Sequence, residues 1–155
     1  MNSVLGLRAE RDDDRAFLED LYSSTRADEL SGLGWNAEQL RSFLALQFGA
    51  REYQYRDHHA AADFLIVTID DEPVGRLVVD RNDLDVYVVD IALLPMHRGH
   101  GLGSALLREV ISAARDDRRT VSLHVDQSNA AVRLYRRLGF EVVEAAGLSW
   151  AMTCR

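Results

Sequence analysis

The sequence predicts an α/β fold of the α+β type, in which a mixed, mostly antiparallel sheet of six or seven strands carries helices on both faces. Two observations lead to this prediction. Three β-branched runs between residues 64 and 94 are separated only by short turns, which is typical of antiparallel strands. A long amphipathic segment then leads to a further strand, and such a helical connection joins parallel strands. The complete predicted order is βααβββαβαββ.

The first third of the chain predicts one strand and two helices. Residues 3–8 match a short strand, and the acidic run 12–14 matches the start of a helix, since carboxylates stabilise helix N-termini. Asn36 is expected to cap the second helix. The polar segment 51–59 is expected to be irregular. Apolar residues recur at helical spacing in both helices: Phe17, Leu18 and Leu21 in the first, and Leu40, Phe43, Leu44 and Phe48 in the second.

The remaining elements follow from the same two periodicities. Strands are predicted at 64–69, 74–79 and 84–94. A helix of about four turns begins at Leu102, because apolar residues then fall on one helical face. A strand at 120–125 is expected to run parallel to the third of the three preceding strands. A helix capped by Asn129 or Ser128 ends at Gly139, and a strand pair closes the chain.

Length and composition limit the function classes. The 155 residues indicate a single domain, 1–155. We find no apolar run of about 18 residues and no signal peptide, so we expect a cytoplasmic protein without a membrane partner. Cys154 is the single cysteine, which excludes a cysteine-based metal site, and no metal is expected. The formal net charge of −7 argues against nucleic acid and favours a small cationic partner.

The stretch LLPMHRGHGLGSALL, residues 93–107, places three glycines between a strand and a helix. Glycine weakens both kinds of element, so the cluster needs a reason. Bare backbone at a helix N-terminus lets a phosphate approach free N–H groups, which predicts a diphosphate site. The lysine of a P-loop is missing, and the G-x-G-x-x-G spacing of a dinucleotide site fits poorly. The pattern [RQ]-x-x-G-x-[GA] fits Arg98, Gly101 and Gly103.

This pattern, placed after an antiparallel meander, resembles the GNAT superfamily of acyl-CoA-dependent N-acyltransferases. The downstream stretch NAAVRLYRRLGF, 129–140, resembles the second signature of that family. The element order agrees along nearly the whole chain, so the resemblance implies the GNAT fold. It also implies acetyl-CoA as co-substrate. The residues that match the diphosphate loop are Arg98, Gly99, His100, Gly101, Leu102 and Gly103, with Ser104 after them.

The resemblance assigns further positions along the cofactor arm. Leu93 and Leu94 match the segment that pairs with pantetheine, and the Leu93 amide is expected to polarise the thioester carbonyl. Asn129 matches a position near pantetheine, although it can equally cap its helix. Tyr135 matches the tyrosine beside the thioester sulfur, where a phenol can protonate the departing thiolate. A packing role under the sheet is the alternative for Tyr135. Arg133, Arg136 and Arg137 are open between the 3′-phosphate of CoA and solvent.

The family keeps no fixed base, so candidates come from the residues themselves. In the strand 120–125, alternation separates Val121, Leu123 and Val125 from Ser122, His124 and Asp126. His124 has a suitable pKa, and Asp90 interrupts an apolar strand, so each is a candidate base or a structural hydrogen-bonding group. Tyr87 and Asp85 lie on the alternation opposite to Asp90. His58 and His59 lack the partners of a metal site.

The expected reaction is transfer of an acetyl group to a primary amine of a small molecule or peptide, by direct attack in a ternary complex. A non-catalytic acyl-CoA-binding regulator on the same fold is the alternative, and a toxin that acylates charged tRNA is disfavoured by the negative charge. Relatives often form homodimers through an edge strand, and the oligomeric state stays open. Candidates for contact with the acceptor are Asp28, Glu29, Trp35 and Trp150, with a solvated or packing role as the equal alternative for all four.

Overall fold

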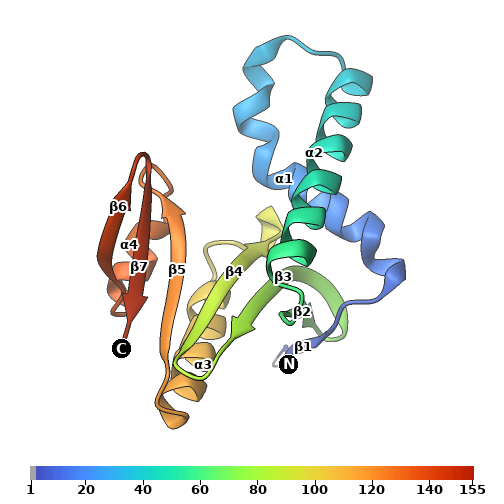
Figure 1. Cartoon of the computed structure of the whole chain (residues 1–155). Coiled ribbons are helices and arrows are strands. Elements are labelled where there is room, and N and C mark those ends of the chain that lie inside the picture. The colour runs from blue at the N-terminus through green and yellow to red at the C-terminus, as the bar shows by residue number, and fades with distance from the viewer. Residues whose placement is uncertain (1–2) are drawn as a thin grey trace. The chain divides into compact units, whose positions relative to one another are not determined.

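The computed structural model describes residues 3–155 and contains a seven-stranded sheet in the order β1-β2-β3-β4-β5-β7-β6 (Figure 1). The chain forms two compact units. The first comprises the chain up to Leu77 together with Ala92–His97, and the second comprises Val78–Ile91 and Arg98–Arg155. The predicted mixed sheet and the element order βααβββαβαββ are confirmed.

The first unit contains the elements predicted for the first third of the chain. Asp12–Asp14 form a 3-10 turn directly before α1, as the acidic run predicted. The element bounds are β1 Leu5–Ala9, α1 Arg15–Leu30, α2 Ala37–His58, β2 Asp63–Ile69 and β3 Glu72–Arg81, the last continuing into the second unit.

Helix α2 begins as predicted and extends further than predicted. The Asn36 side chain accepts from the Gln39 N–H at 2.8 Å, and the Gln39 side chain accepts from the Asn36 N–H at 3.0 Å, which is a reciprocal capping box. The expectation of irregular structure over 51–59 is wrong, because the helix continues to His58. Polar residues stabilise this part: Arg51 stacks on Tyr55 one turn away.

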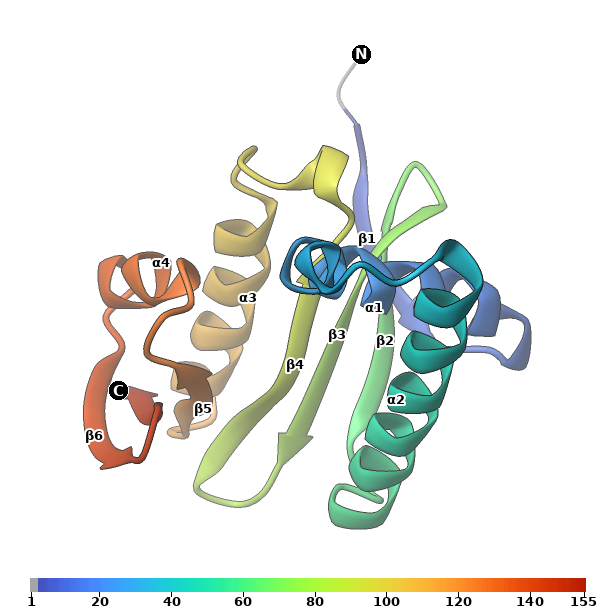
Figure 2. The ribbon, with the colours of Figure 1, turned by 90° about the horizontal axis from the view of Figure 1, so that it is seen from above.

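The core of the first unit lies between α1, α2 and β2. Apolar residues of both helices pack with Ile66 of β2, which is fully buried. Figure 2 shows α2 running next to β2. The helical members of this cluster are Leu18, Leu21, Tyr22, Leu30, Leu44 and Phe48, so the two predicted apolar stripes are the buried faces.

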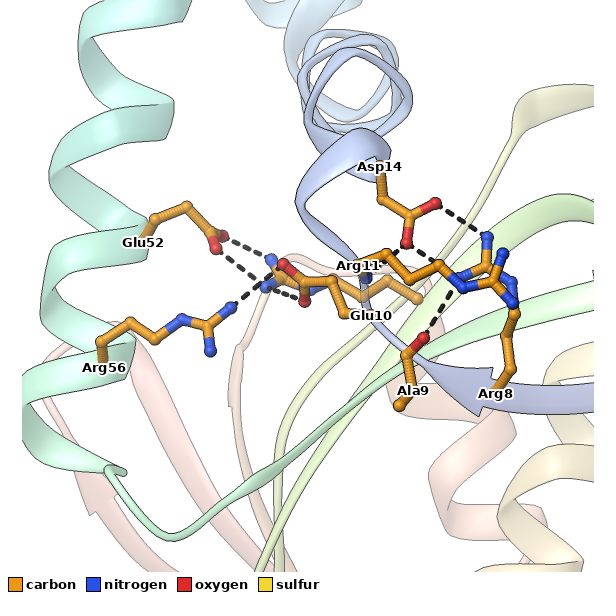
Figure 3. A network of polar contacts seen from close by, with 8 residues as sticks. Arg8, Ala9, Glu10, Arg11, Asp14, Glu52 and Arg56 are labelled. Carbon is orange, nitrogen blue, oxygen red and sulfur yellow. Dashed lines mark hydrogen bonds and ion pairs between the residues drawn. The ribbon is translucent and has the colours of Figure 1, made fainter.

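A buried arginine fixes α2 to the strands (Figure 3). The side chain of Arg76, on β3, is only 3% exposed and pairs with both carboxylate oxygens of Glu52 on α2. Its Nη2 also donates to Glu10 at 3.2 Å, and Arg56 donates to the other Glu10 oxygen at 3.0 Å. A buried charge is costly unless it is paired, so this network holds the helix at one position along the sheet.

A second ion pair holds the start of α1. Arg8 of β1 donates to both oxygens of the buried Asp14 at 2.8 Å, and the Arg11 N–H donates to Asp14 at 2.7 Å (Figure 3). The hydrogen bond from Arg8 is the main cause that lowers the pKa of Asp14, against the opposing effect of burial.

The second unit contains the remaining elements and packs its helices on one face of its strands. Helix α3 presents Leu106, Leu107, Ile111 and Ala114 as its buried face, as its periodicity predicted. Figure 1 shows β5, β7 and β6 side by side, with α4 on one side of them. The bounds are β4 Asp85–Leu93, which ends in the first unit, α3 Leu102–Asp116, β5 Thr120–Asp126, α4 Ala131–Arg137, β6 Glu141–Ala146 and β7 Ser149–Cys154.

Gly139 ends α4 as predicted. It adopts φ 101°, and the Phe140 N–H donates to the Tyr135 carbonyl while the Gly139 N–H donates to the Arg136 carbonyl. This pair of bonds is a Schellman motif, which favours glycine at that position. The motif turns the chain sharply from α4 into β6.

None of the helices found between residues 3 and 155 combines the length and the apolar character needed to cross a membrane.

We predict that Asp14→Asn destabilises the protein at neutral pH by about 1–3 kcal/mol, because it removes a buried charged acceptor of three hydrogen bonds. The folded-state pKa of Asp14 lies below its ordinary value of 3.8. The stabilisation by the ionised Asp14 carboxylate is therefore complete above the ordinary pKa and disappears as the pH falls through the folded pKa. Urea unfolding between about pH 7 and pH 3 should show the two proteins converging at low pH. Asp12→Asn is the matched control, and a constant difference across this range would contradict the assignment.

Candidate active site

The glycine-rich turn leads directly into a helix whose first turn lacks a side-chain cap. Gly101 is the N-cap of α3 at φ 80°, a backbone conformation that favours glycine, and no side chain accepts from the first helical N–H groups. An added Cβ at Gly101 would meet nothing within 4 Å. The amides of Leu102, Gly103 and Ser104 thus begin a helix beside open space, where the helix dipole favours an anion.

The parallel ladder between β4 and β5 is short. It pairs Asp85–Val88 with Thr120–Leu123, as the sequence predicted for the parallel direction. β4 nevertheless continues to Leu93 and β5 to Asp126. The strand edges therefore stop pairing with each other after Val88 and Leu123, and their main-chain groups there require other partners.

The end of β4 is held against β3 in the first unit. The Leu94 N–H donates to the Val74 carbonyl at 2.8 Å, so this amide serves the sheet. A Cβ on Gly75 would lie 2.4 Å from the Ala92 carbonyl oxygen, which no side chain could tolerate. Gly75 therefore permits the close approach that positions Leu93, the residue expected to polarise the thioester.

Tyr135 lies on the buried face of α4, only 8% exposed, and meets Phe140 edge-to-face. Burial, and after it the negative charge of Asp90, raise the pKa of this phenol. Asp90 shares the alternation of Val86 and Val88, which are buried. The structure thus brings together two of the three predicted catalytic residues, and Tyr135 is held protonated at neutral pH.

The third candidate, His124, lies elsewhere and has a different partner. Its Nδ1 lies 2.9 Å from the Tyr87 hydroxyl, and the two rings are 5.6 Å apart. Burial raises the pKa of Tyr87, so its hydroxyl keeps its proton. Sequence reasoning gave Tyr87 no role. The contact between Tyr87 and His124 depends on the strand register, in which Tyr87 pairs with Ser122 across the β4–β5 ladder. Only knowledge of that register could have revealed the contact.

The predicted faces of β5 are confirmed. Val121, Leu123 and Val125 are buried, while His124 and Asp126 are exposed. Asp85 lies with the exposed set, since its carboxylate accepts from the hydroxyls of Thr120 and Ser122. The sheet therefore separates His124 and Tyr87 on one face from Asp90 and Tyr135 on the other.

The structure also shows the contacts of several other candidate residues. The Asn129 side-chain oxygen accepts from the Ala131 N–H at 2.9 Å. The N-cap of α4 is nevertheless Ala130, without a side-chain cap, so the prediction that Asn129 or Ser128 is the N-cap is wrong. Trp150 pairs with Val125 and lies under Arg136 of α4, and its position as a wall of the acceptor site stays a prediction. Trp35 packs edge-to-face with Phe43.

The histidines outside this pair form no candidate metal site. His58 bonds to the Gln54 carbonyl at 3.0 Å at the end of α2. Within residues 3–155 we find no cluster of three or more His, Cys, Asp or Glu side chains that could hold a metal ion.

Known proteins share sequence and fold with this chain. The model of the acetyltransferase (GNAT) family matches residues 18–140. An uncharacterized N-acetyltransferase of Methanocaldococcus jannaschii is 33% identical over 90 residues, which cover 52% of this chain and 40% of that protein. The match thus spans less than half the length of this relative.

Two solved structures share the fold over nearly the whole chain. The PaiA N-acetyltransferase of Thermoplasma acidophilum, in complex with coenzyme A, superposes with a TM-score of 0.74 at 16% identity, covering 98% of this chain and 99% of that one. Naa50 of Arabidopsis thaliana, in complex with the bisubstrate analogue CoA-Ac-MVNAL, gives 0.62 at 20% identity, covering 97% and 98%.

The family match includes the meander, the glycine-rich turn, α3, β5 and α4, which are the elements that carry the candidate site. With more than half of its residues matched by the family model, the chain belongs to the GNAT family of acetyltransferases.

Proposed function

We propose that this acetyltransferase moves the acetyl group of acetyl-CoA to a primary amine by direct attack in a ternary complex. The observation that carries the proposal is the uncapped start of α3 behind Gly101. It offers main-chain N–H groups and a positive dipole end to a diphosphate. Arg98 and His100 flank the same turn and add donors. Relatives of this fold crystallised with coenzyme A or a CoA-containing analogue support CoA as the ligand.

The pantetheine arm is proposed to follow the strand edges beyond the β4–β5 ladder. An extended arm can pair with main-chain groups there as an added strand would. The Leu93 N–H is the proposed donor to the thioester oxygen, where negative charge develops during attack. Asn129, whose side-chain oxygen accepts from the Ala131 N–H, is proposed to contact the arm through its amide nitrogen.

Proton transfer is proposed to use both faces of the sheet. The acceptor ammonium loses a proton to His124, directly or through water, while Tyr87 orients the imidazole. The free amine attacks the carbonyl carbon, the nitrogen of the tetrahedral intermediate loses its second proton to water, and the carbon–sulfur bond breaks. Tyr135 gives its proton to the departing thiolate, and its raised pKa keeps that proton available. A primary amine of a small molecule or peptide fits this scheme, and a CoA-Ac-MVNAL complex of Naa50 supports a peptide as one form of acceptor.

We predict that Gly101→Val abolishes acetyl-CoA binding, because the side chain occupies the phosphate space and strains the backbone at positive φ. Gly34→Val is a matched control, since Gly34 has φ 71° and equally open surroundings. Calorimetry should show normal affinity for the control alone. Wild-type affinity in Gly101→Val would remove the diphosphate site from this turn.

We predict that Tyr135→Phe lowers kcat about a hundredfold or more while acetyl-CoA affinity stays nearly unchanged, because only the proton for the thiolate is lost. Tyr53→Phe, at a tyrosine that is 72% exposed, controls for loss of a phenol elsewhere. A thiol-release assay over an amine panel provides the measurement. Unaltered kcat would exclude the acid role, and tight CoA binding with no amine-dependent release in the wild type would indicate the regulator instead.

We predict that His124→Ala lowers kcat/KM most strongly at neutral pH, by about a hundredfold or more. The loss should shrink at alkaline pH, where the acceptor amine is already free. Tyr87→Phe should lower kcat/KM less than His124→Ala does, with the same dependence on pH, because it disturbs only the orientation of the imidazole. Ser122→Ala, on the same face, is the control. A loss that is equal at every pH would assign His124 a structural role.

A further inference from the structure

A β-bulge in β6 turns two glutamates toward the face of the sheet that carries His124. Glu141 pairs with Thr153, and Glu144 pairs with Ala151, although two residues lie between the glutamates and only one lies between their partners. The extra residue lies in the bulge between Val142 and Glu144. Without the bulge, alternation would place the two carboxylates on opposite faces.

Glu144 lies in the same row of the sheet as His124. His124 pairs with Ala151 on β7, and Ala151 pairs with Glu144 on β6. Two strand spacings separate the Cα atoms of His124 and Glu144 by about 9.5 Å. The residue between them carries only a methyl group, so no long side chain in this row stands between the imidazole and the carboxylate.

Of the carboxylates on this face, Glu141 and Glu144 have no hydrogen-bond or ion-pair partner within residues 3–155, and Glu144 is the one in the row of His124. Asp85 on this face already accepts from Thr120 and Ser122, and Asp126 accepts from Ser128 at the turn before α4. Glu144 is exposed, and within residues 3–155 no hydrogen bond or ion pair engages its carboxylate.

The strands around this row carry no cationic side chain that could compete for Glu144. β4, β5, β6 and β7 contain neither arginine nor lysine. Five arginines of the same unit lie on its helices instead: Arg108 and Arg115 on α3, and Arg133, Arg136 and Arg137 on α4. The face that carries His124 therefore holds carboxylates, and the four strands give it no arginine. A second cationic group on an acceptor would meet attraction on this face.

We propose that Glu144 is a specificity-determining residue that binds a second ammonium group of the acceptor, so that the preferred substrates are diamines or longer oligocationic amines. The inference rests on the proposed function, because it takes the Tyr87–His124 pair as the place where the reacting amine loses its proton. The second ammonium keeps its proton and stays on the carboxylate while the first nitrogen attacks the thioester.

The test compares putrescine, a four-carbon diamine, with butylamine, its monoamine counterpart, as acceptors in the thiol-release assay. The wild type should favour putrescine in kcat/KM by about three- to fivefold, the size expected of an exposed ion pair. Raising the salt concentration should reduce this ratio. Glu144→Gln should bring the ratio close to one, and Glu144→Asp should keep part of it.

Two further variants make the test specific. Glu141→Gln should lower the ratio less than Glu144→Gln, because Glu141 lies one row further from His124. Glu109→Gln, at an exposed position of α3, should leave the ratio as in the wild type. A wild-type ratio near one, or a ratio that Glu144→Gln does not change, overturns the inference while amine-dependent release still supports the proposed function. Release that neither amine stimulates overturns both.

Discussion

The early end of the β4–β5 ladder is the constraint on which the candidate site depends. Two parallel strands that stop pairing after Val88 and Leu123 leave edges whose polar groups need another partner. The same ladder fixes the direction of every side chain along both strands. It turns Tyr87 and His124 to one face and Asp90 toward Tyr135 on the other, so the proposed proton acceptor and the proposed proton donor are separated by the thickness of the sheet.

Charge is used differently in the two units. In the first unit, two arginines pair with carboxylates: the buried Arg76 with Glu52 and Glu10, and the partly exposed Arg8 with the buried Asp14. Their role is to hold helices on strands, since a buried pair loses its compensation when either partner moves. In the second unit, α3 and α4 carry five arginines, one of which stacks on Trp150 of β7, whereas β4, β5, β6 and β7 carry none. This distribution suits the proposed reaction between a polyanionic donor and a cationic acceptor.

Much of the fold could be predicted because its signals are local. Asn36 and Gln39 cap α2, Gly139 ends α4, and the apolar period of α3 marks its buried face. The prediction of irregular structure over 51–59 failed, because this part of α2 consists mostly of polar side chains. Glu52 and Arg76 are 24 residues apart in sequence, and their ion pair contributes stability that periodicity cannot show.

The sequence by itself determined the glycine turn before α3, the alternation of β5 and the position of Tyr135 in its motif, because these depend on backbone dihedrals and short periods. Only the tertiary structure decided that His124 meets Tyr87, that Asp90 acts on Tyr135, and that Glu144 shares the face of His124. These depend on register and on one bulged residue. A shift of one residue along a strand turns every side chain to the opposite face, and no local signal fixes that shift.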